Sequence, residues 1–239
     1  MADNEKDLHS NSRRQLLKGA LVGGATIGVS PAISAAQVAN NKNEEAPVAA
    51  YMFLTPKEAS FIEAVVDHMV PADDLTPKGT DLGINIFIDR ALAGSWGRGD
   101  RMYMQGPWQS GTPSQGYQSP LLPSQLYRAG IAATNQVCEK LHGKSFDLLD
   151  VNQKEDILKQ LDAGKITFDG GLPSRTFFNL LYKTVVEGMF SDPIYGGNAN
   201  KAGWKMLGFP GVIQTNARNI VEFKNKRFTP EVFSIKDMS

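Results

Sequence analysis

The sequence predicts a mainly α-helical protein: a single domain of about five or six helices with a long irregular arm and extended terminal segments. Five stretches carry apolar residues at three- and four-residue spacing, which is the period of an amphipathic helix. Most of these stretches are bounded by capping residues, glycine or proline. No stretch shows the sustained apolar–polar alternation that is typical of a half-buried strand. We therefore expect helices packed on helices.

The first two helices are predicted soon after a polar N-terminal region. Thr55-Pro56-Lys57-Glu58 forms a capping box with proline at the first helical position, and the apolar period continues to about Met69. The second helix is expected from about Leu82 to Ala93, with Asp81 as its cap and Gly94 closing it.

Three further helices follow in the second half of the chain. One is expected from about Ser124 to Leu141, and both Cys138 and Leu141 fall on its apolar stripe. The next is capped by Asp150, with a glutamine three residues on, and ends at Gly164; the last begins at Pro173-Ser174.

Between the second and third helices, residues 94–123 form a long irregular arm of about thirty residues, far longer than an ordinary connection. It contains Trp96, Tyr103, Trp108 and Tyr117 among several glycines and prolines. Three interpretations stay open: a flap folded over its own domain, an arm laid on a partner protein, or a lid over a ligand. The partner interpretation makes these aromatic residues candidate interface residues.

The N-terminal region is typical of a twin-arginine export signal. Arg13 and Arg14 stand directly before a mildly apolar run, Gly19–Val29, that is too short to span a bilayer. Small residues from Ala32 to Ala36 suit peptidase cleavage. We expect a signal peptide at residues 1–36, recognised by the twin-arginine translocase, and a periplasmic location. The further expected organisation is a linker at 37–50, the helical domain at 51–211 and a C-terminal tail at 212–239.

Composition excludes several classes of protein. Lys+Arg and Asp+Glu both count 25, and residues 1–36 hold four basic and three acidic residues, so 21 and 22 remain. Such a balance does not favour nucleic acid as a partner. Cys138 is the only cysteine, which excludes internal disulfides, Cys-ligated clusters and covalent haem attachment. We expect a buried core thiol, with a disulfide to another chain as the alternative.

No catalytic, cofactor or metal site is predicted in this chain. The motifs GxSxG, HExxH, GxGxxG, the P-loop and the EF-hand loop are missing. His68 and His142 are interpreted as structural residues on or at the ends of helices. The Gly196-Gly197-Asn198 run is interpreted as a turn rather than an anion-binding nest. Asp67, Asp73, Asp74 and Asp81 fit no calcium loop and are assigned to turns and caps.

The C-terminal third carries the most specific pattern in the chain. The runs Glu187–Asn198 (EGMFSDPIYGGN) and Gly203–Gly211 (GWKMLGFPG) resemble the hallmark of the gluconate 2-dehydrogenase subunit 3 family. The resemblance extends back through Phe87-Ile88-Asp89-Arg90 and Val70–Asp74 and covers roughly Phe53 to Gly211. In the arm, Gly106-Pro107-Trp108 and Gln115–Gln118 resemble the gluconate-type small subunits more than those of sorbitol, fructose or glucose complexes.

The resemblance implies the small subunit of a periplasmic, membrane-bound dehydrogenase complex. Its large subunit holds FAD and oxidises gluconate, and a multihaem cytochrome c subunit passes electrons to quinone. No catalytic residue is attributed to the small subunit, whose implied work is to stabilise the large subunit and to carry it through twin-arginine export. Tyr195 and Trp204 join the arm aromatics as candidate interface residues.

Three alternatives stay open. The chain is the small subunit of a related sugar or polyol dehydrogenase, or an export chaperone that releases its client. Otherwise it is a self-sufficient exported sugar-acid-binding protein that uses the Gly196-Gly197-Asn198 turn and Trp204.

Overall fold

The computed structural model describes residues 50–109, 111–112, 115, 118–168, 171–213 and 216–238. The predicted signal peptide with Arg13 and Arg14, most of the linker, and Tyr117 lie outside the described residues.

Within this described part the chain forms seven α-helices and no strand, so the mainly α-helical prediction is confirmed. Five of the helices match the five predicted from sequence. Two six-residue helices were not predicted individually because they are too short to show a helical period. The helices are α2 (Pro56–Met69), α3 (Ile84–Ala93), α4 (Pro123–His142), α5 (Val151–Asp162), α6 (Ser174–Phe190), α7 (Ala202–Leu207) and α8 (Ala217–Glu222). Short 3-10 turns are η2 (Phe146–Leu148), η3 (Pro193–Tyr195), η4 (Ala199–Lys201) and η5 (Ile235–Met238).

Some helices start where residues close in the sequence cap them, and another starts where a distant segment packs against it. The capping boxes at Thr55 of α2 and Asp150 of α5 are both formed, as predicted. The predicted cap Asp81 is wrong, because α3 begins at Ile84 after Gly83, which has φ +73° and no side-chain capping bond. A Cβ on Gly83 would lie 2.3 Å from the carbonyl oxygen of Gly196, so contact with a distant turn fixes this start.

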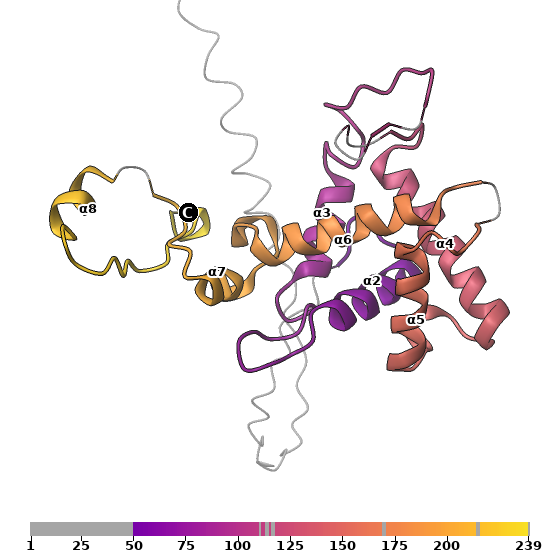
Figure 1. Cartoon of the computed structure of the whole chain (residues 1–239), viewed down its shortest axis with the longest axis horizontal. Coiled ribbons are helices and arrows are strands. Elements are labelled where there is room, and N and C mark those ends of the chain that lie inside the picture. Colours follow the sequence, from indigo (N-terminus) through magenta and orange to yellow (C-terminus); the bar gives the residue numbers. More distant parts are fainter. Residues whose placement is uncertain are drawn as a thin grey trace, which may run out of the picture. The chain divides into compact units, whose positions relative to one another are not determined.

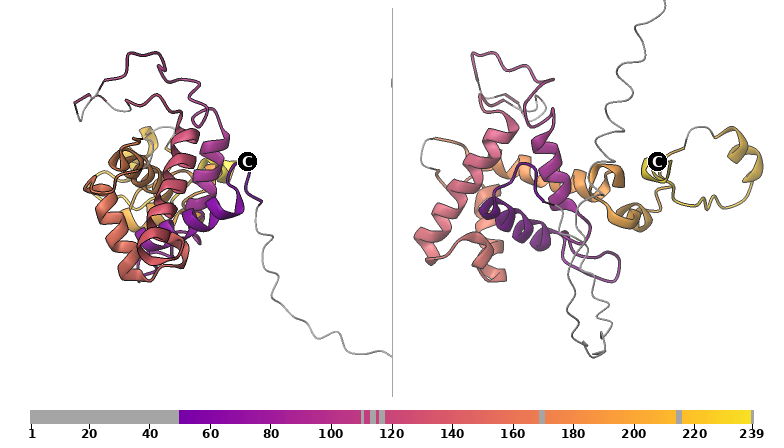
Figure 2. Two further views of the ribbon diagram at one scale, coloured as in Figure 1. Left: turned by 90° about the vertical axis from the view of Figure 1, so that its right-hand side faces the viewer. Right: turned by 180° about the vertical axis from the view of Figure 1, so that it is seen from behind.

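The core is built around α6, which packs against α3, α4 and α5 (Figure 1, and from behind Figure 2). Phe177 of α6 is fully buried, with its ring centroid 6.0 Å from that of Tyr127 and 6.4 Å from that of Phe61. Gly130 of α4 makes this approach possible, since a Cβ there would lie 2.2 Å from Phe177 Cδ2. These aromatic contacts join α2, α4 and α6 into one core.

The end of α4 departs from the sequence expectation. Cys138 is fully buried, as predicted, but Leu141 is 59% exposed rather than buried. The α-helix ends one residue later at His142, and Gly143 turns the chain away with φ +68°. Leu141 therefore lies on a solvent-facing side of the last turn of α4, whereas His142 beside it contacts Gln153 of α5.

Candidate functional site

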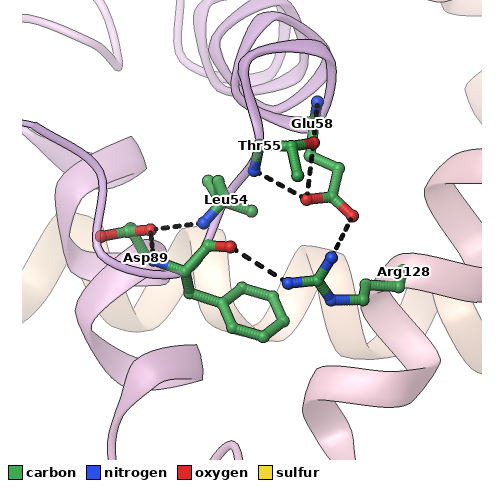
Figure 3. Close-up of polar contacts among 6 residues, drawn as sticks. Leu54, Thr55, Glu58, Asp89 and Arg128 are labelled. Atoms are coloured by element: carbon green, nitrogen blue, oxygen red, sulfur yellow. Dashed lines mark hydrogen bonds and ion pairs between the residues drawn. The ribbon is translucent and has the colours of Figure 1, made fainter.

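The first described residues after the predicted linker are held by one buried carboxylate. Asp89 of α3 accepts hydrogen bonds from three consecutive backbone N–H groups: that of Met52 at 2.7 Å and those of Phe53 and Leu54 at 2.9 Å each, the last two of which are drawn in Figure 3. Its side chain is almost fully buried. A charged acceptor with several aligned donors makes stronger hydrogen bonds than neutral groups do. We call this arrangement, residues 51–54 with Asp89, the N-terminal clasp.

Arg128 of α4 secures the clasp from the other side. Its guanidinium Nη2 donates to the carbonyl oxygen of Phe53 at 3.2 Å, and its Cζ lies 4.3 Å from the centroid of the Phe53 ring. Nη1 lies 3.4 Å from Oε1 of Glu58, the same carboxylate that closes the capping box with Thr55 (Figure 3). Through Arg128, α4 and the start of α2 thereby contact the same short segment, which is residues 51–54.

Tyr51 forms the outer end of the clasp. Its hydroxyl donates to Glu63 of α2 and accepts a hydrogen bond from Asn85 of α3 at 2.6 Å. Burial and the hydrogen bond to Glu63 raise the pKa of Tyr51, so the hydroxyl stays protonated and keeps its donor role at physiological pH. Residues 51–54 are thus tied to three helices at the point where the predicted linker joins the domain.

Sequence reasoning did not assign this role to Asp89. The residue belongs to the Phe87-Ile88-Asp89-Arg90 run of the resemblance, which was the only signal for it. An aspartate on the otherwise apolar stripe of a short helix is the observation that could have identified it, because such a carboxylate needs buried donors.

The hallmark segment after α6 is a tightly packed turn. Asn198, fully buried with φ +50°, donates to the carbonyl of Ser191 at 2.9 Å and accepts from the N–H of Gly203 at 2.8 Å. A Cβ on Gly197 would lie 2.2 Å from the carbonyl oxygen of Gly188. Gly197, Gly203 and Asn198 are therefore required by close packing against the end of α6.

Tyr195 and Trp204, both candidate interface residues, differ in accessibility. Trp204 is only 6% exposed; its Nε1 donates to the carbonyl of Phe190 at 2.7 Å, and its ring meets Phe209 edge-on at 5.2 Å. Tyr195 is exposed. In the folded chain Tyr195 is available for contact with another molecule, whereas Trp204 is engaged in internal packing.

A surface cavity of about 470 Å³ lies beside this turn, lined among others by Arg90, Lys201 and Asp237. Lys201 Nζ donates to Asp237 Oδ2 at 2.8 Å, which brings η5 of the C-terminal tail onto the hallmark segment. This hydrogen bond and those from Ser234 lower the pKa of Asp237 to about 2. Asp192 adds a second tie by accepting from the N–H of Ile235 at 2.7 Å.

The arm between α3 and α4 has a fixed base and an exposed outer part. Trp96 is half-buried against the core, and the N–H of Ser124 donates to the carbonyl of Gly97 at 3.1 Å. Tyr103 is exposed and Trp108 half-buried, and both line a cavity of about 280 Å³. The arm thus folds back at its base and presents Tyr103 and Trp108 at its outer part.

The other candidate reactive side chains are engaged inside the domain. Burial raises the pKa of the Cys138 thiol to about 11, so the thiol is protonated and shielded; a disulfide to another chain would require it to reach the surface. Nε2 of His68 lies 2.7 Å from Oε2 of Glu155, and this contact is the main cause of a lowered Glu155 pKa. Nδ1 of His142 lies 3.4 Å from Nε2 of Gln153.

Two further properties concern only the part of the chain that the structure describes. There, no three or more His, Cys, Asp or Glu side chains gather in a way that could hold a metal ion. None of the helices described is both long enough and apolar enough to cross a bilayer.

In the comparison with protein families, the model described as gluconate 2-dehydrogenase subunit 3 matches residues 56–211, from the first residue of α2 to the last glycine of the hallmark runs. Comparisons with curated proteins and with solved structures gave no match.

Proposed function

Since the chain belongs to the gluconate 2-dehydrogenase subunit 3 family, we propose that it is the non-catalytic small subunit of a periplasmic, membrane-bound gluconate 2-dehydrogenase. The complex would oxidise the C2 hydroxyl of D-gluconate to the ketone of 2-dehydro-D-gluconate. The two electrons would pass from FAD in the large subunit through haem c of a cytochrome subunit to quinone. This chain would bind no cofactor itself.

The family match is the observation that carries the proposal, and the matched residues show what this chain contributes. The hallmark residues Asn198, Gly197 and Trp204 are used for internal packing, which suits a structural subunit. Exposed Tyr103 and Tyr195 and half-buried Trp108 offer aromatic contact area for the large subunit. Aromatic anchors of this kind dominate the binding energy of many protein interfaces.

The N-terminal clasp supports the export part of the proposal. A twin-arginine signal carries folded cargo, so the pull on Arg13 and Arg14 must reach the folded domain through the linker. That pull enters at Tyr51, and Asp89 and Arg128 resist it through hydrogen bonds to the backbone of residues 52–54. The large subunit would fold around FAD in the cytoplasm and cross the membrane while bound to this anchored domain.

Isolation of the complex tests the assignment. A tag at the C-terminus of this chain should co-purify a flavin-containing and a haem c-containing subunit from the membrane fraction. Added D-gluconate should bleach the flavin and reduce the haem. Co-purified subunits that respond only to sorbitol, fructose or glucose would assign the chain to a related complex. Absence of any flavin subunit would contradict the proposal, and a flavin subunit released after export would indicate a chaperone.

Export is tested separately through the arginine pair. Changing Arg13 and Arg14 to lysine keeps the charge but removes the paired guanidinium groups. We expect the large subunit and its activity to remain in the cytoplasm. Lys18→Arg is the matched control, because it alters a neighbouring cation and leaves the pair intact. Normal periplasmic activity in the double variant would refute the escort role.

A further inference from the structure

Two described stretches of the C-terminal tail, residues 212–213 and 216–233, are here called the tail loop, and their outer ends, Val212 and Phe233, meet. Gly211 and Phe233 form an isolated parallel β-bridge, and the N–H of Val212 donates to the carbonyl of Phe233 at 2.8 Å. The N–H of Phe233 in turn donates to the carbonyl of Pro210 at 3.1 Å. In Figure 1 the yellow chain runs from α8 back to this bridge. The closed base limits the conformational freedom that a docking event would otherwise have to remove.

The outer part of the tail loop exposes apolar side chains instead of burying them. Ile220 and Val221 of α8 are 69% and 78% exposed, and α8 has no buried residue. Phe223 and Phe228 meet edge-on at 5.0 Å beside an open depression of about 330 Å³, and Phe228 is itself exposed. Four large apolar side chains within nine positions are more than a surface loop ordinarily shows.

The same stretch concentrates positive charge. Arg218, Lys224, Lys226 and Arg227 are all exposed, against the single acidic residue Glu222 between positions 218 and 228. None of these four cations forms an ion pair with another described residue. Since the chain beyond residue 36 has 21 basic and 22 acidic residues, this excess is local.

We propose that the tail loop docks on an anionic lipid surface. Ile220, Val221 and Phe228 would enter the boundary between headgroups and acyl chains, and the surrounding Lys and Arg side chains would contact lipid phosphates. Short segments that combine an apolar cluster with Lys and Arg bind membrane surfaces in this way.

The charge pattern favours lipid over a protein as the occupant. Protein interfaces are depleted in lysine relative to the rest of the surface, whereas the exposed Lys224 and Lys226 stand beside this apolar cluster. A juxtaposed anionic leaflet supplies the complementary charge to all four tail-loop cations at once. The inference does not depend on which sugar acid the complex oxidises.

A probe on the loop itself provides the test. In the full chain, Val221→Cys is labelled with an environment-sensitive fluorophore, because Cys138 is buried and protected from the reagent. The matched control is Leu148→Cys, at an exposed apolar position of η2 (65%). Vesicles contain either phosphatidylcholine alone or phosphatidylcholine with about 30 mol % phosphatidylglycerol. The export signal is present in both proteins and carries neither label.

The expected result is a blue shift and quenching by spin-labelled lipid at position 221 on the anionic vesicles only, with no change at position 148. Changing Lys224, Lys226 and Arg227 to glutamine should weaken the partitioning detected at position 221 about a hundredfold, since each cation near an anionic surface contributes roughly a factor of five. The matched control changes Lys144, Lys159 and Lys183 to glutamine and should alter it less than about twofold.

Two outcomes would overturn the proposal. One is an unshifted probe at position 221 on anionic vesicles. The other is a set of tail-loop variants that partition like wild type but no longer co-purify the flavin or haem subunits, which would identify the loop as a protein interface. A normal lipid response without co-purified subunits in wild type would contradict the proposed function instead, so the two failures are distinguishable.

Discussion

Asp89→Asn should release the N-terminal clasp without unfolding the helical domain. The asparagine can keep its carbonyl oxygen where Oδ1 accepts from Phe53 and Leu54, but its amide then faces the N–H of Met52, which loses its acceptor. A hydrogen bond to a charged group is worth about 1.5–3 kcal/mol, and the two remaining bonds fall to the strength of neutral ones.

The expected loss is therefore about 3 kcal/mol in the free energy of holding residues 51–54 in place. A total stability of roughly 5–15 kcal/mol tolerates this loss. If the clasp unfolds together with the core, the melting temperature falls by roughly 6–12 °C for a domain of this size. If it opens locally, the melting temperature changes less, but the amides of residues 52–54 exchange with solvent about a hundredfold faster.

Calorimetry together with hydrogen exchange read at residues 52–54 distinguishes these two cases. Asp73→Asn is the matched control, because Asp73 also accepts two backbone N–H groups at 2.8 Å but is exposed, so water can replace the lost interaction. Asp73→Asn should change the melting temperature and the exchange rates by less than half as much as Asp89→Asn does. Equal behaviour of the two variants would refute the reasoning that burial makes the Asp89 clasp strong.

Three further predictions concern the core, the thiol and the tail. Gly130→Ala should lower the free energy of unfolding by about 1–3 kcal/mol in urea titration, since its methyl group would overlap Phe177. A change well under about 1 kcal/mol would show that the neighbouring side chains shift to accommodate the methyl group. Cys138 should resist alkylation until the chain is denatured. Because its pKa is raised to about 11, the contribution of Cys138 to folding stability should be lost from about pH 9 to pH 11, where the thiol is ionised only in the unfolded chain. Cys138→Ser should make the loss of stability over this range smaller, and the raised pKa values of Tyr51 and Tyr127 should leave a further loss at higher pH. A disulfide-linked band on a non-reducing gel would contradict the buried thiol. Asp237→Asn should accelerate proteolysis of the tail by removing the negative charge that pairs with Lys201. Because the Asp237 pKa is lowered to about 2, wild type should acquire the same sensitivity only as the pH falls from about 4 toward 2. Equal cleavage rates in wild type and Asp237→Asn would show that the docking of η5 does not depend on the Asp237 carboxylate.

The helices could be predicted from the sequence because their signals are local. The capping box at Thr55 and the Asp150 cap each involve residues three positions apart, and the apolar period repeats within one segment. The prediction failed where another segment decided the outcome. Asp81 does not cap α3, because Gly83 must approach the carbonyl of Gly196. Leu141 is exposed, because it lies on a side of the last turn of α4 that faces solvent.

The candidate site was predictable only in part. The hallmark residues were visible as a pattern, but the sequence did not indicate that Trp204 is buried while Tyr195 is exposed. Both are aromatic residues in a turn-rich segment, and their accessibility depends on the packing of Phe190 and Phe209 around the indole.

By itself the sequence determined the family and the helical class, and its single cysteine excluded internal disulfides, because each of these depends on residue type and short spacing. Only the tertiary structure decided that Asp89 holds a segment 35 to 37 positions earlier and that Asp192 and Lys201 tie down a tail about 40 positions later. It likewise showed a cationic apolar loop closed at its base. The physical reason is that a buried carboxylate or a backbone bridge takes its partners from whichever segments folding brings close, and separation along the chain carries no record of that approach.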